Sequence, residues 1–149
     1  MLALLAALVL QGPDIPPPRG LVNDFANVIP GSSAARLEQI AGDVRAKSQG
    51  EIAVVTLPQL NNYPPYEVAL RIGREWGVGP MGEAGEAQKN LGAVILVVPK
   101  ETSENGRGRC YVATGRGAEG FLTDGEVAGF CREAVPFFQA RDYGRGMCS

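Results

Sequence analysis

Residues 109–138 read RCYVATGRGAEGFLTDGEVAGFCREAVPFF, and this stretch decides the fold. Its first six residues, 109–114, are rich in aromatic and β-branched side chains and predict a strand. Residues 115–122 form a glycine-rich loop. Beyond the loop, apolar residues recur every three or four positions, which is the period of one helix face. The members of this apolar stripe are Val127, Phe130, Cys131, Ala134, Val135 and Phe138.

The helix after the loop has a strong start signal. Thr123 and Glu126 have the T-x-x-E spacing of a capping box, in which the hydroxyl accepts a hydrogen bond from the N3 backbone and the glutamate accepts one from the N-cap backbone. We therefore expect the helix to open at Thr123-Asp124. This places Glu119 and Asp124 beside the junction of the loop and the helix.

Working outward, the preceding chain alternates helix and strand patterns. A helix is predicted to start within residues 30–33 and to end with Gly50 as its C′ residue. Apolar runs at 51–57 and 91–98 predict strands covered on both faces, and a second helix opens between them at Pro64-Pro65. The order α-β-α-β-β-α predicts a single α/β domain, a three-layer α-β-α sandwich with a mixed central sheet.

The direction of the strands brings distant residues together. A β-α-β crossover makes strands 51–57 and 91–98 parallel, and the short link 99–108 makes the next strand antiparallel to 91–98. The start of strand 91–98 and the end of strand 109–114 then share one end of the sheet. We expect Asn90, Glu119 and Asp124 to converge there.

The composition excludes several classes of function. The net charge is −2, so no basic surface points to nucleic acid. The chain has no histidine, which rules out Ser-His-Asp and Cys-His catalysis and removes the commonest metal ligand. At 149 residues, the chain can bury a sizeable core without metals or disulfides. We expect a monomer.

The N-terminus carries a signal-like segment. Residues 1–12 begin with an apolar run that is too short to span a bilayer but fits the hydrophobic region of a signal peptide. The alternative is a terminal strand or helix that packs in the fold. Residues 13–20 are proline-rich and predict an extended linker, so the domain is expected to occupy residues 21–149. Within it, Asn23-Asp24 suits a turn.

The three cysteines allow more than one state. In an exported protein one pair could be oxidised, which would leave an odd thiol. Cys110 lies within a predicted strand and Cys131 on the apolar helix stripe, so we expect both to serve as small buried hydrophobic residues. Cys148 stays unassigned. No C-x-x-C spacing is present, which argues against a zinc or redox site.

The loop at residues 115–120 matches G-x-G-x-x-G but does not fit a dinucleotide site. That fingerprint needs the helix to open within the motif and a further strand to follow it. Here the capping box delays the helix to Thr123, and Glu119 would set a carboxylate against a pyrophosphate. The carboxylates suit a hard cation better, because calcium prefers oxygen ligands. The alternatives are a dipole-complementing acid for Asp124 and a solvated loop charge for Glu119.

The motifs, taken in order, resemble the TPM domain family, also called TPM phosphatase. The resemblance covers about residues 20–146. It rests on an ordered set of short matches: Val22-Asn23-Asp24 with Ala26, Glu51 to Val55, Trp76 to Gly79, Gly92 before its apolar strand, Gly115 to Gly120 with Thr123-Asp124, Pro136 with Phe138, and Asp142 to Gly146.

The resemblance implies an α/β sandwich with an acidic pocket at one end of the sheet, where members bind divalent cations, calcium in particular. The plant member is associated with acid phosphatase activity and with photosystem II repair. Bacterial members are often exported and anchored by a C-terminal transmembrane helix. We therefore expect this chain to be exported, either naturally short or excised from a longer anchored protein, with a membrane protein as a possible partner.

Carried over position by position, Asp24, Glu119 and Asp124 match acidic positions of the family. Asn90 stands where the family often has aspartate, and Leu91 replaces the following asparagine. The loss of one negative charge should weaken cation affinity. The expected metal site is thus Asp24, Asn90, Glu119 and Asp124.

Two functions follow from these residues. The first is a non-catalytic, calcium-binding module that assists assembly or repair. The second is a metal-assisted acid phosphatase, which commonly needs two metals or a covalent nucleophile. The loop offers few ligands and only Arg116 as an anion partner, so binding is favoured over catalysis.

Overall fold

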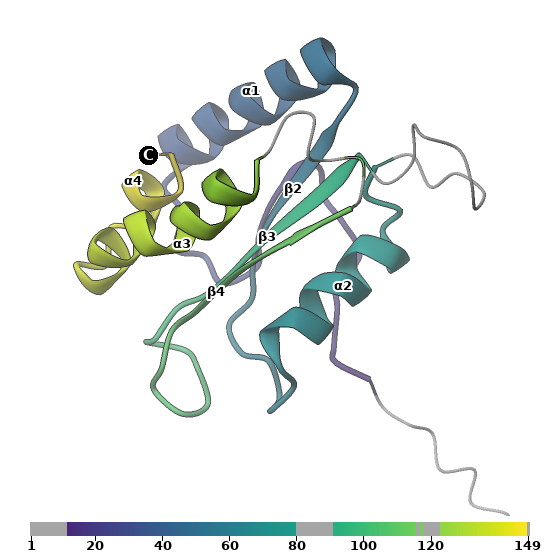
Figure 1. Ribbon diagram of the computed structural model, residues 1–149. Helices are drawn as coiled ribbons and strands as arrows, with labels where there is room; N and C mark the ends of the chain where they lie inside the picture. The colour runs from purple at the N-terminus through teal and green to yellow at the C-terminus, as the bar shows by residue number, and fades with distance from the viewer. Residues whose placement is uncertain (1–11, 80–90, 116, 118–122, 149) are drawn as a thin grey trace, which may run out of the picture.

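The computed structural model describes residues 12–79, 91–115, 117 and 123–148 of the chain (Figure 1). Helices and strands alternate along most of this length. In chain order they are β1 (Val22–Asp24), α1 (Gly31–Ser48), β2 (Glu51–Thr56), α2 (Pro65–Glu75), β3 (Gly92–Val98), β4 (Arg109–Thr114), α3 (Asp124–Gln139) and α4 (Tyr143–Cys148).

The four strands form one mixed sheet in the order β1-β2-β3-β4. The pairs β1–β2 and β2–β3 are parallel, and β3–β4 is antiparallel, as the connections predict. The bounds predicted for β4 are confirmed. The turn predicted at Asn23-Asp24 lies slightly later: both residues belong to β1, and the turn starts at Asp24, whose carbonyl accepts from Asn27 N at 3.3 Å. Pairing with a strand some thirty residues away is a non-local contact that overrides the local turn preference.

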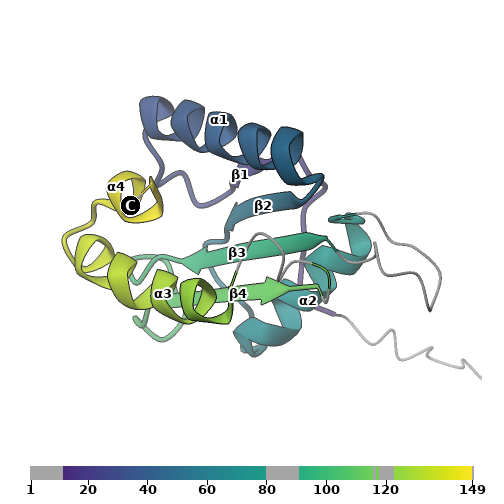
Figure 2. The same cartoon turned by 45° about the horizontal axis from the view of Figure 1, so that its top comes forward.

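Helices cover both faces of the sheet, which confirms the three-layer sandwich (Figure 2). Alternate residues of a strand point to opposite faces. On β2 and β3, Val55 and Leu96 pack with α2, whereas Val54 and Val97 pack in the layer formed by α1, α3 and α4. The unbroken apolar runs in the sequence therefore arise from strands that are buried on both sides.

The two parallel crossovers differ in handedness. The connections through α1 and through α2 both step across the sheet in the same direction, from β1 to β2 and from β2 to β3. Leu37 of α1 and Ile72 of α2 nevertheless pack on opposite faces. Two crossovers with the same step and opposite faces have opposite hands, so one of them departs from the right-handed rule.

The start of α3 follows the sequence closely. Glu126 N donates to Thr123 Oγ1 at 3.2 Å, and Thr123 N donates to Glu126 Oε2 at 2.8 Å, so the capping box is confirmed. Ala134 and Phe138 of the apolar stripe are buried. Val135 was placed on the same stripe, but 39% of its surface is exposed.

The C-terminal helix α4 was not expected from the sequence, because glycines are poor helix formers. Its two glycines fit close packing instead. A Cβ on Gly144 would lie 2.3 Å from Ser33 Oγ, and one on Gly146 would lie 2.5 Å from Phe138 Cε1. At the end of α1, Gln49 and not Gly50 adopts the left-handed conformation, with φ of 60°.

The proline-rich segment before β1 packs on the domain. Ile15 contacts the core on the α2 face, and Trp76 Nε1 donates to Pro16 O at 3.1 Å. The Arg19 guanidinium lies 4.9 Å from the centre of the Phe25 ring, a cation–π distance. These contacts tie the expected linker to the domain that follows it.

Cys110 of β4 and Cys131 of α3 form a disulfide, with their Cα atoms 5.7 Å apart. The expectation that both serve as free hydrophobic residues is therefore wrong. A strand residue and a helix residue that face the same core layer can meet at bridging distance, and the pattern of the sequence does not separate this case from simple packing. Cys148 is the free cysteine.

We expect the loss of this disulfide to lower the free energy of unfolding by about 3 kcal/mol, because a cross-link over 21 positions restricts the unfolded chain. Denaturant unfolding of a Cys110→Ala/Cys131→Ala variant measures the change, with Cys148→Ala as the matched control. Thiol titration of the unreduced, denatured protein should detect only Cys148. Titration of all three cysteines before reduction would contradict the pairing.

Candidate functional site

Three backbone segments meet at one end of the sheet. Gly115 N donates to Gly92 O at 2.8 Å, which joins the end of β4 to the start of β3. Gly79 has a left-handed φ of 79°, and a Cβ on it would lie 2.5 Å from Gly92 N. A Cβ on Gly92 would lie 2.2 Å from Val78 O, so only glycines permit this approach. We call this meeting point of residues 78–79, 91–92 and 115 the glycine junction.

The segments that carry most of the predicted metal ligands begin or end at the glycine junction. Asn90 precedes Leu91 directly, and Glu119 lies between Gly115 and Thr123. Both residues fall outside the described parts of the chain. Asp124 is the first residue of α3, and its side chain is likewise outside the description. The predicted shared end of strands β3 and β4 is confirmed; the ligation by Asn90, Glu119 and Asp124 stays a prediction.

Glu126 is already engaged at this end. Its Oε2 accepts from both the backbone N–H and the hydroxyl of Thr123, at 2.8 and 3.1 Å. The carboxylate therefore serves the helix start. Among the described residues, no group of three or more acidic or cysteine side chains is placed to hold a metal.

Asp24 lies at the opposite end of the sheet. It pairs with Thr56 of β2, which pairs with Val97 of β3. Val97 is five positions from Gly92, which at about 3.3 Å per residue is roughly 17 Å along the strand. The structure therefore does not bring Asp24 to the glycine junction.

The Asp24 carboxylate organises the turn that leads into α1. It accepts hydrogen bonds from the backbone of Val28 at 3.1 Å and of Ile29 at 2.9 Å, and from Thr56 Oγ1 at 2.7 Å. Thr56 Oγ1 in turn accepts from Ala26 N at 3.1 Å. Three donors on a half-buried carboxylate are typical of a structural acceptor.

A cavity of about 250 Å³ lies beside the glycine junction, between α2 and the adjoining strand ends. Its described lining is mostly apolar, with Leu70 and Val94 among its walls. Arg74 is the charged side chain among the described lining residues. The acidic character implied by the family resemblance would have to come from residues 80–90 and 118–122.

The TPM domain family model matches residues 22–149, which is most of the chain. This chain belongs to the TPM domain family. A comparison with curated proteins finds no match.

Solved structures share the TPM domain fold. The N-terminal domain of a P. gingivalis protein superimposes with a TM-score of 0.68 at 26% identity, over 86% of this chain and 74% of that one. The N-terminal domain of a Corynebacterium glutamicum protein gives a TM-score of 0.63 at 17% identity, over 87% and 74%. The second likeness shows the fold alone.

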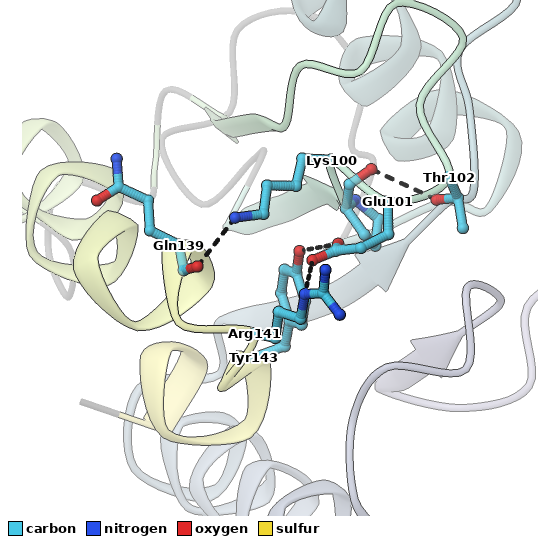
Figure 3. Close-up of polar contacts among 7 residues, drawn as sticks. Lys100, Glu101, Thr102, Gln139, Arg141 and Tyr143 are labelled. Atoms are coloured by element: carbon cyan, nitrogen blue, oxygen red, sulfur yellow. Dashed lines mark hydrogen bonds and ion pairs between the residues drawn. The ribbon is translucent and has the colours of Figure 1, made fainter.

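The end of the TPM domain that holds Asp24 carries a second polar cluster (Figure 3). Tyr143 donates its hydroxyl hydrogen to Glu101 Oε2 at 2.5 Å, and Arg141 Nε lies 3.3 Å from Glu101 Oε1. Burial opposes ionisation of Glu101, but the hydrogen bond from Tyr143 and the charge of Arg141 prevail and lower its pKa. Burial, together with this hydrogen bond, raises the pKa of Tyr143 to about 12.

Sequence reasoning missed this cluster, because its partners lie about forty positions apart and no local motif joins them. The pairing locks the loop after β3 to the start of α4. The Tyr143 hydroxyl is held as a donor, so the cluster is structural.

We expect Asp24→Ala to lower the free energy of unfolding by about 2 kcal/mol, because it leaves the N–H groups of Val28 and Ile29 without an acceptor. Thr56→Val should cost about 2 kcal/mol, because it removes both the hydrogen bond to Asp24 and the one from Ala26 N. Urea unfolding measures both. The exposed Asp43→Ala on α1 is the control, and an equal cost for Asp24→Ala would refute the structural role.

Because the pKa of Tyr143 is raised, we expect the domain to lose stability at alkaline pH. A tyrosine that titrates at about 12 when folded and at about 10 when unfolded stabilises the domain fully below pH 10 and loses this contribution as pH rises towards 12. In urea unfolding from pH 9 to 12, Tyr143→Phe should flatten the decline in stability. Tyr66→Phe, at an exposed position on α2, should leave it unchanged. Equal slopes in the wild type and in Tyr143→Phe would contradict the assignment.

Proposed function

We propose that this TPM domain binds a divalent cation, calcium foremost, at the glycine junction through Asn90, Glu119 and Asp124. The observation that carries the proposal is the 2.8 Å hydrogen bond from Gly115 N to Gly92 O. It joins the roots of the two segments on which Asn90 and Glu119 lie. Asp24 is left out of the proposed site because its carboxylate is engaged at the other end of the sheet.

The chemistry of the two segments supports a hard cation. Carboxylate, amide and backbone carbonyl oxygens are the ligands that calcium takes. The segment 80–90 also contains Glu83 and Glu86, so acids outnumber bases there. Asn90 in place of an aspartate lowers the charge of the site, and we expect weak affinity compared with a site of three carboxylates.

We further propose that the domain works outside the cytoplasm as a non-catalytic assembly or repair module. The Cys110–Cys131 disulfide supports this location, because such bonds persist in oxidising compartments. The apolar run at residues 1–10 supports it as well. No helix in the described parts of the chain is long and apolar enough to cross a membrane.

Arg74 favours a second candidate, the metal-assisted hydrolysis of phosphomonoesters. Its side chain lines the cavity beside the glycine junction, where it could hold a phosphate group that a cation also binds. The sequence offers no histidine and few further ligands for two metals. Cation binding without catalysis therefore remains the primary proposal.

Calcium should raise the melting temperature of the domain, because a ligand that binds only the native state stabilises it. Asp124→Asn should abolish the rise. Asp24→Asn should start from a lower melting temperature and keep the calcium-induced rise, and Asp43→Asn, at an exposed position on α1, should behave like the wild type. The absence of a shift at millimolar calcium in the wild type would sink the proposed site. A shift lost in Asp24→Asn but kept in Asp124→Asn would move the site to the other end.

Phosphate release by the highly purified protein separates the two candidates. Turnover that requires calcium and disappears in both Arg74→Gln and Asp124→Asn would establish the phosphatase. A calcium-induced shift in melting temperature without turnover would support the binding module. Turnover that persists in the Arg74→Gln/Asp124→Asn double variant would indicate a contaminant or another site.

A further inference from the structure

A groove lies on the α3 side of the sheet, away from the glycine junction. It runs between the hairpin loop 99–108 and the second half of α3, and its volume is about 310 Å³. We call this groove the hairpin groove. The lining residues named below all lie in the described parts of the chain. Val135 and Phe138 supply apolar walls, and Lys100 and Arg107 supply positive charge. Val98 and Arg109 also line the groove, but this cross-strand pair faces the α2 layer.

The two cations of the hairpin groove, Lys100 and Arg107, are not neutralised by its lining, which among the described residues contains no carboxylate. Lys100 Nζ donates to the backbone carbonyl of Gln139 at 2.9 Å. This bond to a neutral carbonyl orients the ammonium group and leaves its charge unpaired. The Arg107 side chain forms no ion pair with any described residue.

The nearest acids of the hairpin loop are engaged elsewhere. Glu101 pairs with Tyr143 and Arg141 (Figure 3). Glu104 accepts from the backbone N–H groups of Leu60 and Asn62 at 3.2 and 3.1 Å, in an adjoining hollow. Arg109 lines the same hollow, and its positive charge interacts with Glu104 there. Positive charge therefore prevails in the groove of a chain whose net charge is −2.

The apolar walls of the groove are shaped in advance. The Cys110–Cys131 disulfide holds β4 against α3, and Cys110 itself lines the groove. Val135 belongs to the apolar stripe of α3 yet is 39% exposed here, so the groove leaves apolar surface open to water. A preformed concave site loses less entropy on binding than one that must be ordered.

We propose that the hairpin groove binds a medium-chain carboxylate, with its alkyl chain against Val135 and Phe138 and its carboxylate between Lys100 and Arg107. The volume lies at the lower end of the range of small-molecule sites, which suits a short alkyl chain rather than a long lipid. The planar guanidinium group of Arg107 matches a carboxylate in shape and charge. This site is distinct from the proposed cation site in place and in charge.

Titration with octanoate, followed by amide chemical shifts of the full chain, tests the proposal. Octanoate should shift residues of β4 and the second half of α3 at millimolar concentration. 1-Octanol, which has the same chain and no charge, should bind about tenfold more weakly, and octylammonium should not bind there. Octyl phosphate binding more tightly than octanoate would overturn the choice of a carboxylate.

Two variants separate the charged and apolar contributions. Lys100→Gln/Arg107→Gln should weaken octanoate about tenfold and leave 1-octanol unchanged. Val135→Glu, at an exposed position, should weaken both ligands. The exposed Arg132→Gln on α3 lies outside the groove lining and is the matched control. Equal affinity for octanoate and 1-octanol, or unchanged octanoate binding in a folded double variant, would overturn the proposal.

Discussion

The burial of β3 on both faces is the constraint on which the rest of the fold depends. Leu96 and Val97 are neighbours, they point to opposite faces, and neither has exposed surface. Such a strand needs a layer on each side of it. It also needs a partner strand at each edge, because buried backbone N–H and C=O groups must be paired. The strands β2 and β4 fill the two edges, and α2 packs opposite the other three helices.

The two ends of β3 adjoin different segments. Its first residue, Gly92, belongs to the glycine junction, from which the segments that carry Glu83, Glu86 and Glu119 extend. Its last residue, Val98, lies beside Lys100 and lines the hairpin groove. The antiparallel strand β4 repeats this arrangement, since Arg109 lies at the groove and Thr114 at the junction. The pair β3 and β4 thus separates the proposed cation site from the proposed carboxylate site.

The sequence predicts well those features that local patterns decide. The bounds of β4 and the capping box at Thr123 follow from a handful of adjacent residues, and the strand directions follow from the lengths of the connections. Features that need distant partners were missed. The strand β1 exists because it pairs with β2, and Tyr143 finds Glu101 across about forty positions. The handedness of each crossover likewise depends on a distant contact, namely the face of the sheet on which its helix packs.

The predicted site residues also fall into those that local patterns and topology place and those that they do not. The shared end of β3 and β4 could be derived from topology, whereas Asp24 entered through the family resemblance, which carries no geometry for an individual carboxylate. An acidic residue of a motif can stabilise a turn as well as bind a ligand. Here the hydrogen bonds that Asp24 accepts from Val28 N and Ile29 N show that its carboxylate stabilises a turn.

The disulfide bears on both proposed ligand sites. Cys110 and Cys131 lie on either side of the segment 115–123, so the bond closes that segment into a ring together with parts of β4 and α3. Closing a chain in advance lowers the entropy that is lost when it is ordered. A cation taken up by Glu119 and Asp124 would then meet a loop whose ends are already fixed. Cys110 also lines the hairpin groove, so the same covalent link borders the proposed carboxylate site.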